Sequence, residues 1–185
     1  MEWTTELRYK RYEDWTEEEK KQIKENMANS PWHTHYHVEP KTGLLNDPNG
    51  FSYFNGKWIL FYQNFPFGAA HGLKSWVQLE SDDLVHFKET GLKVLPDTPL
   101  DSHGAYSGSA MQFDDKLFLF YTGNVRDENW IRHPYQIGAL LDQDGNLEKI
   151  DQILIDQPED ATDHFRDPQI FKFKDQYYAI VGGQD

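Results

Sequence analysis

The sequence predicts an all-β protein of the β-propeller class, and three observations support this. From Trp32 onward, short apolar runs alternate with turn dipeptides, and no long stretch with helical periodicity interrupts them. Aromatic residues make up 15% of the chain, which is typical of folded β-structure rather than of a disordered segment. A tight turn followed by an aromatic-aliphatic strand also recurs at nearly constant spacing, as successive propeller blades require.

The N-terminal segment differs from the rest because it is charged and has a helical pattern. Thr16 is a candidate N-cap, and Glu19 lies three residues on as its capping box. Ile23 and Met27 lie one helical turn apart and could dock on the remainder of the chain. The dipeptide Ser30-Pro31 ends the segment. We therefore expect a helical extension over residues 1–31 and a partial propeller domain, the candidate catalytic domain, over residues 32–185.

The repeat becomes visible when the turns are aligned. Lys57 and Lys116 follow equivalent turns 59 residues apart, and Gln176 follows a third turn 60 residues later. Further turn dipeptides are Asn49-Gly50 and Asp144-Gly145. The predicted blades run from about residue 47 to 90 and from about 107 to 155, and a third begins at 167. Coincidental hairpins in a β-sandwich are the alternative.

A closed propeller needs at least four blades, whereas this pattern yields about two and a half. We therefore expect a truncated propeller, or one that another chain completes. The open edges of such a sheet favour pairing with another chain, so self-association is one candidate property.

The same alignment places Asp47, Ser107 and Asp167 at equivalent positions, each at the start of a predicted innermost strand. These strands converge on the propeller axis, so we expect the three side chains to meet in one funnel. Two carboxylates that face a sugar are the minimal apparatus for glycoside hydrolysis. The alternative for Asp47 is a bare turn, because Asp-Pro and Asn-Gly are common turn formers.

Neighbouring side chains suggest the charge state of each carboxylate. We expect the amides of Asn46 and Asn49 to hydrogen-bond to Asp47 and hold it ionised, and Arg166 to keep Asp167 ionised. Neither aspartate would then serve as the general acid. The alternative for Arg166 and Asp167 is a surface ion pair of little energetic value.

Six stretches, taken in order, resemble glycoside hydrolase family 32, which contains invertases, levanases, inulinases and sucrose-6-phosphate hydrolases. The match extends over residues 37–183. The six stretches are Leu45-Asn46-Asp47-Pro48-Asn49-Gly50, Gln63-Asn64-Phe65-Pro66, Ser81-Asp82-Asp83-Leu84-Val85-His86-Phe87, Tyr106-Ser107-Gly108-Ser109-Ala110, Tyr121-Thr122-Gly123-Asn124 and Phe165-Arg166-Asp167-Pro168.

This resemblance implies a five-bladed propeller, normally followed by a β-sandwich, and cleavage of sucrose or its 6-phosphate with retention of configuration. It implies that Asp47 is the nucleophile, which forms a covalent fructosyl-enzyme, and that Asp167 stabilises the transition state with Arg166. The acid/base glutamate of the family lies in a downstream Glu-Cys motif, and no residue here matches it. We therefore expect this chain alone to lack useful hydrolase activity.

The resemblance also implies a set of substrate-binding residues. A Trp-Met pair that many members carry is replaced here by Leu44-Leu45, which bears on substrate preference. The full set is Leu44, Leu45, Asn46, Gln63, Trp76, Tyr106, Ser107, Arg166 and Asp167.

The segment from His71 to Trp76 is similar to that of bacterial sucrose-6-phosphate hydrolases. His71 and Lys74 would suit a phosphate group, unless both are solvated loop residues. A separate group, His33, His35 and His37, would lie on one face if the segment were a strand, and a metal site is one alternative there. The family mechanism uses no metal, and we predict no metal and no cofactor.

The net charge of −13 argues against nucleic acid and anionic membranes as partners, and favours a small-molecule fructoside. The N-terminus lacks the pattern of a signal peptide and no apolar run is long enough to span a membrane, which together predict a cytoplasmic protein. With no cysteine, a disulfide framework is excluded. Remaining alternatives are a fructoside-binding module without catalysis, and the chemistry of arabinan-cleaving enzymes or levansucrases, which use related propellers.

Overall fold

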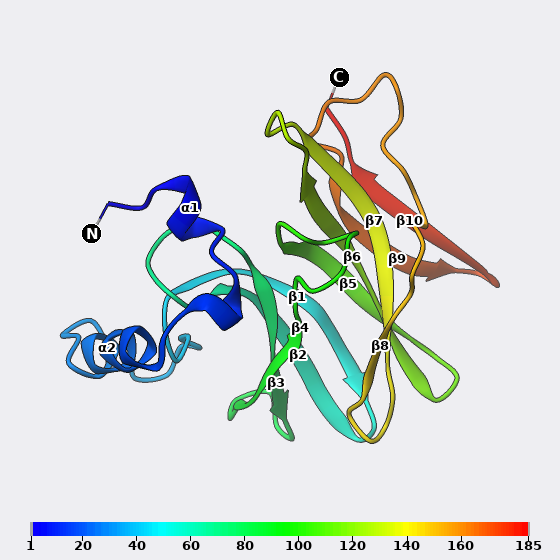
Figure 1. Cartoon of the computed structure of the whole chain (residues 1–185). Coiled ribbons are helices and arrows are strands. Elements are labelled where there is room, and N and C mark those ends of the chain that lie inside the picture. The colour runs from blue at the N-terminus through cyan, green and yellow to red at the C-terminus, as the bar shows by residue number, and fades with distance from the viewer. Residues whose placement is uncertain (1, 185) are drawn as a thin grey trace.

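The computed structural model describes residues 2–184, so residues 1 and 185, the outer ends of the two expected segments, lie outside it. Three antiparallel sheets follow one another along the chain (Figure 1), with four, four and two strands. The strands of the first sheet are β1 (Leu44–Phe54), β2 (Lys57–Phe65), β3 (Ser75–Ser81) and β4 (Lys88–Val94). The remaining strands are β5 (Ala105–Phe113), β6 (Lys116–Arg126), β7 (Arg132–Leu141), β8 (Leu147–Lys149), β9 (Arg166–Phe173) and β10 (Gln176–Gly182). The all-β class is confirmed.

The first hairpin of each sheet turns at an equivalent residue. Asn55, Asp114 and Lys174 have φ values of 49°, 50° and 56°, in the left-handed region that tight hairpin turns require. These three residues occupy the same position in the repeat found in the sequence. The three sheets therefore correspond to the three repeat units, and each begins within three residues of the predicted start.

The first strands of consecutive sheets lie side by side and are joined by polar side chains. The Gly108 N–H donates to Asn49 Oδ1 (3.0 Å), which joins β5 to β1. Ser109 Oγ donates to the carbonyl of Pro168 (2.9 Å) and accepts from the Ile170 N–H (2.9 Å), which joins β5 to β9. This is the relation of innermost strands in neighbouring propeller blades. An apolar core fills the space between the first two sheets, with Phe61, Trp76 and Tyr121 at its centre.

The prediction of a turn at Asn49-Gly50 was wrong, because both residues lie inside β1. The register between β1 and β2 shifts between Asn49 and Ser52, which marks a bulge. Gly50 has a φ of 55°, and a Cβ there would lie 2.9 Å from the Phe61 ring. The glycine therefore serves a bulge packed against a buried ring rather than a reversal of the chain.

The N-terminal segment forms the predicted helices. They are α1 (Thr5–Arg8), a 3₁₀ turn η1 (Tyr12–Asp14) and α2 (Glu17–Ala28). Thr16 and Glu19 form the expected capping box at the start of α2. Trp15 is buried and stacks on Phe67 of the first sheet's connection, with ring centroids 4.4 Å apart. Ile23 packs against the same apolar cluster, which confirms the predicted docking for this residue, whereas Met27 is not part of the cluster.

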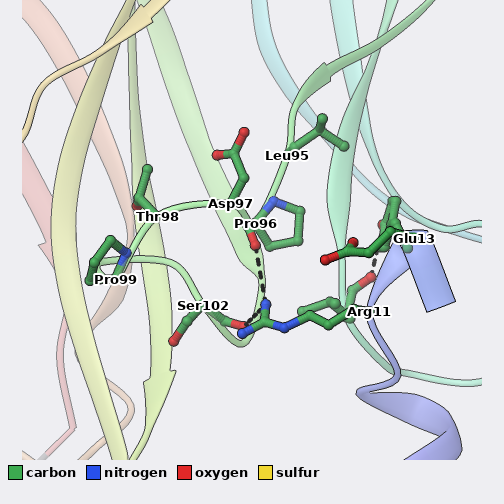
Figure 2. A pocket seen from close by; sticks show the side chains of 10 residues that line it. Arg11, Glu13, Leu95, Pro96, Asp97, Thr98, Pro99 and Ser102 are labelled. Carbon is green, nitrogen blue, oxygen red and sulfur yellow. Dashed lines mark hydrogen bonds between the residues drawn. The ribbon is translucent and has the colours of Figure 1, made fainter.

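The extension also holds two loops of the sheets in place. The carbonyl of Arg8 accepts from the Leu73 N–H (2.7 Å), and Tyr12 Oη donates to the Leu73 carbonyl (2.9 Å). Arg11 reaches across a pocket of about 470 Å³ and donates to the carbonyls of Pro96 and Ser102 (Figure 2). This pocket is a junction between the extension and the loop that leads into β5. Within residues 2–184, no helix has both the length and the apolar character needed to cross a membrane.

A buried charge network fixes the same loop. Asp101 is fully buried and accepts from Thr98 Oγ1 (2.7 Å), from Tyr121 Oη (2.9 Å) and from Lys149 Nζ. Lys149 comes from β8 and also pairs with Asp97 (2.6 Å). Because Asp101 lies four residues before the start of β5, this network sets the position from which β5 enters the molecule.

We predict that Lys149→Met lowers the free energy of unfolding by about 3 kcal/mol or more, because it leaves the buried Asp101 carboxylate without its cation. The measurement is urea denaturation. Lys21→Met is the control, since it breaks an exposed pair with Glu25 and should cost less than about 1 kcal/mol. Equal effects of the two substitutions would contradict the structural role of the network.

Candidate active site

Asp47 lies near the start of β1 and is held by a residue of the next sheet. Ser107 Oγ, from β5, donates to Asp47 Oδ2 at 2.6 Å. The predicted meeting of Asp47 with Ser107 is therefore confirmed. The Asp47 side chain is bound through one oxygen, and among the hydrogen bonds of residues 2–184 none occupies Oδ1. That oxygen is available to a substrate.

The expected source of Asp47 orientation was wrong. The Asn49 side-chain amide donates to the backbone carbonyl of Asp47 (3.0 Å) instead of its carboxylate. Asn46 Oδ1 is buried and has no hydrogen-bond partner in the described part of the chain. The Ser107 hydroxyl therefore takes the role that we expected of these amides.

Asp167 lies at the start of β9 in an uncommon backbone conformation, with a φ of 62°. Its N–H donates to Thr122 Oγ1 of β6 (3.0 Å), and this hydroxyl donates to Gln136 Oε1 of β7 (2.7 Å). Gln136 Nε2 then donates to the Phe165 carbonyl (3.0 Å). Left-handed backbone at a residue other than glycine costs of order 1 kcal/mol or more and persists when the surroundings hold it. This buried chain of hydrogen bonds supplies that support.

The electrostatic environment of Asp167 differs from the expectation. Burial raises its pKa above the ordinary value, and the nearby Asp47 charge adds to the increase. Arg166 and Lys74 oppose the increase, and Arg166 Nε lies 3.5 Å from Asp167 Oδ2. Desolvation therefore outweighs the Arg166 charge in setting the direction of this shift, contrary to the expectation that Arg166 dominates.

Lys74 is a buried cation at the centre of the site. Its Nζ donates to Gln63 Oε1 (2.7 Å) and lies 5.5 Å from the centroid of the Tyr106 ring. Burial lowers its pKa to about 8, and the charges of Asp47 and Asp167 limit this decrease. The alternative in which Lys74 is a solvated loop residue is excluded, since only 7% of the residue is exposed.

The other predicted substrate-binding residues differ in how deeply their side chains are buried. Gln63 lies behind Ser107, with Nε2 at 3.4 Å from Ser107 Oγ. Trp76 is fully buried and donates through Nε1 to the Tyr106 carbonyl (3.0 Å), so the expectation that it lines the pocket was wrong. The Trp76 indole is part of the apolar core, and its hydrogen bond holds the backbone of Tyr106. Leu44 and Leu45 pack against two separate apolar clusters of the first sheet.

The histidines fall into two groups. His71 is exposed, its carbonyl accepts from Arg8 Nε (2.5 Å), and the Lys74 charge lowers its pKa. The segment that carries His33, His35 and His37 forms no strand, so the expected common face does not exist. His33 pairs with Glu39 (2.8 Å) instead. Over the residues that the structure describes, no group of His, Asp or Glu side chains is arranged to hold a metal ion.

Sequence reasoning did not assign roles to Thr122 and Gln136. Thr122 lies in one of the six matching stretches, which is the signal that could have marked it. Gln136 lies outside those stretches, and only the pairing of β6 with β7 brings its amide to Thr122.

The family of this chain is shown by comparison with known proteins. The family model for the glycosyl hydrolases family 32 N-terminal domain matches residues 37–185. A sucrose-6-phosphate hydrolase of Streptococcus mutans is 72% identical over 96% of this chain and 37% of its own length. One of Lactococcus lactis is 55% identical over the whole chain and 39% of its own length. The chain therefore spans less than two fifths of these relatives.

The solved structures that resemble this chain also belong to enzymes that act on sucrose derivatives or fructosides, by their own descriptions. The structure of a sucrose-6-phosphate hydrolase from Lactobacillus gasseri superposes with a TM-score of 0.96 at 50% identity, over 100% of this chain and 38% of that one. A variant of a Bombyx mori family 32 beta-fructofuranosidase in complex with sucrose superposes with a TM-score of 0.74 at 32% identity, over 92% of this chain and 38% of that one. The chain belongs to glycosyl hydrolase family 32 and carries the N-terminal domain of that family.

Proposed function

We propose that this chain supplies the nucleophile and the fructosyl-binding site of a retaining β-fructofuranosidase that acts on sucrose or sucrose 6-phosphate. The observation that carries the proposal is the contact of Ser107 with Asp47, next to a second carboxyl group on Asp167. A carboxylate held through one oxygen presents the other to a sugar, which is what a glycosyl-enzyme mechanism requires.

In the proposed reaction, Asp47 Oδ1 attacks the anomeric carbon of the fructosyl group while the bond to the glucosyl oxygen breaks. The leaving oxygen takes a proton from a general acid, and water later hydrolyses the fructosyl ester on Asp47. Asp167 and Arg166 bind fructosyl hydroxyls. Tyr106 forms the wall beside Lys74.

We propose that the general acid is absent from residues 2–184. The two carboxyl groups at the site already have other roles, and the charges that act on Lys74 come from Asp47, Arg166 and Asp167, with no glutamate among them. Loss of general-acid help typically lowers a rate about 10²–10⁴-fold. We therefore propose that this chain alone is nearly inactive and belongs to a five-bladed catalytic domain, beginning near residue 32 after the helical extension, that is normally followed by a β-sandwich.

For the substrate, we propose sucrose 6-phosphate ahead of free sucrose. The relatives at 72% and 55% identity are both sucrose-6-phosphate hydrolases. Of the two residues first considered for the phosphate, Lys74 is occupied by Gln63 and faces Asp47, which suits a fructosyl contact better. His71 stays a candidate for the phosphate, although its lowered pKa makes it a weak counter-ion.

Self-association is a second candidate property, favoured by the surface of the third sheet. β10 pairs only with β9 among the described strands, so its other edge is open. Phe173, Tyr177, Tyr178 and Ile180 are between 42% and 61% exposed on this hairpin. Open edges with apolar side chains favour pairing with another chain.

Incubation with β-fructosyl fluoride should produce a covalent adduct on this chain, because fluoride leaves without a proton and Asp47 can still attack. The adduct should persist, since activation of water also needs the missing acid/base. Intact-mass spectrometry measures it. Asp47→Asn should abolish the adduct, and Ser107→Ala should slow its formation roughly tenfold through loss of a charge-assisted hydrogen bond.

Asp175→Asn, in the β9–β10 turn, is the matched control and should leave adduct formation unchanged. A wild-type chain that gains no mass would mean that the site does not assemble. A stable adduct in Asp47→Asn would reject Asp47 as the nucleophile.

Stability should rise with pH through the titration of Lys74. Burial lowers its folded-state pKa to about 8, while the unfolded chain holds this proton up to about pH 10.4, so unfolding takes up a proton between these values. The free energy of unfolding should therefore increase by roughly 2 kcal/mol from pH 7 to pH 10. Lys74→Met should remove most of this increase in urea titrations, and exposed Lys88→Met should retain it. The same slope in all three proteins would show that Lys74 is not the buried cation described.

Sedimentation velocity should show a concentration-dependent oligomer. Ile180→Lys on β10 should shift the population toward monomer, because a buried lysine opposes strand pairing. Val85→Lys is the control, since Val85 is also exposed but lies in the β3–β4 connection. A wild-type monomer at all concentrations would reject self-association.

A further inference from the structure

Two arginines lie directly opposite each other where β6 ends and β7 begins. Arg126 pairs in register with Arg132 across the hairpin. Like charges at facing positions on a sheet destabilise it unless something neutralises them. The chain has a large excess of acidic residues, so this concentration of positive charge calls for a local explanation.

The carboxylates near this hairpin neutralise these two charges only in part. Arg132 Nη1 lies 3.6 Å from Asp163 Oδ2, which is beyond a normal charge-assisted hydrogen bond. The Asp127 carboxylate is occupied by His133 (3.2 Å) and by the N–H groups of Asn129 and Ile131. Arg126 Nη1 donates only to a neutral acceptor, the carbonyl of Trp130 (2.9 Å).

Both guanidinium groups also carry an unused donor. The Nε atoms of Arg126 and Arg132 are buried and have no hydrogen-bond partner within residues 2–184. A buried donor on a charged group without an acceptor is costly and uncommon in native proteins. Among the hydrogen bonds of residues 2–184, each guanidinium group uses only Nη1, for a backbone carbonyl, so the second terminal nitrogen of each arginine can donate to a ligand.

Aromatic rings place this pair beside the candidate active site. The Arg132 guanidinium carbon lies 5.8 Å from the centroid of the Tyr106 ring, and Lys74 Nζ lies 5.5 Å from the same centroid. Tyr106 directly precedes Ser107, which binds Asp47. Arg126 lies 5.7 Å from the centroid of Trp130. Lys74 and Arg132 contact the same tyrosine ring, which places a ligand held by the arginines close to the fructosyl-binding side chains.

We propose that Arg126 and Arg132 bind the phosphate group of a phosphorylated sugar, next to the fructosyl site. The placement beside Asp47 rests on the proposed function, while the anion site rests on the arginine pair itself. Two planar guanidinium groups match a phosphate monoester in charge and in hydrogen-bonding geometry. In a chain with a net charge of −13, such a local site is required to hold an anionic substrate. His71 and Lys74 are then free of this role.

The test measures binding of glucose 6-phosphate, glucose and inorganic phosphate to the whole chain by isothermal titration calorimetry. Wild type should bind glucose 6-phosphate at least tenfold more tightly than glucose, and inorganic phosphate should compete with it. Arg126→Gln and Arg132→Gln should each weaken glucose 6-phosphate binding at least tenfold and remove its preference over glucose. Lys172→Gln is the matched control, because this cation also lies over a tyrosine ring, 5.4 Å from the centroid of Tyr177, but on the third sheet.

Circular dichroism checks that each variant is folded, and Arg126→Lys and Arg132→Lys replace any glutamine variant that is not. The lysine variants should also lose most of the preference, because they lack the guanidinium fork. The proposal is overturned if wild type shows no preference for the phosphorylated sugar, if both arginine variants keep it, or if His71→Gln alone removes it. Formation of the fructosyl adduct on wild type is a separate measurement. If no adduct forms but glucose 6-phosphate still binds more tightly than glucose, the proposed nucleophile is rejected and the phosphate site is retained.

Discussion

The candidate site depends on the lateral contact between the first strands of consecutive sheets. β1, β5 and β9 carry Asp47, Ser107 and Asp167, and these residues share one site only because their strands are adjacent. Small polar side chains make this adjacency possible, since Asn49 and Ser109 satisfy backbone groups of the neighbouring strand. Larger side chains in these positions would separate the strands and leave those backbone groups without partners.

Around this contact, the outer parts of the molecule act as supports. The Asp101–Lys149 network fixes the loop that enters β5, and the N-terminal extension fixes the loop that carries Lys74. On the far side, Thr122 and Gln136 hold the backbone of Asp167 in its left-handed conformation. Residues that never touch a substrate therefore determine where the polar groups of the site lie, which is common for sites built on a rigid scaffold.

The cations near the site fall into two groups with different surroundings. Lys74 lies among the carboxylates with its pKa lowered by burial, whereas Arg126 and Arg132 face each other on the β6–β7 hairpin. The Tyr106 ring is in contact with both Lys74 and Arg132. A neutral fructosyl unit and an anionic phosphate need different surroundings, and this separation would allow one molecule to meet both.

The sequence by itself determined the all-β class, the repeat, the capping box and the meeting of Asp47 with Ser107, because hairpin turns, strand periodicity and caps are local features with a fixed spacing. It also supplied the family through ordered short stretches. The tertiary structure decided the bulge at Asn49-Gly50, the burial of Trp76 and Lys74, the direction of the Asp167 pKa and the pairing of Arg126 with Arg132. These properties arise from desolvation and from contacts between residues on different strands, and neither is encoded in the identity of the neighbours along the chain.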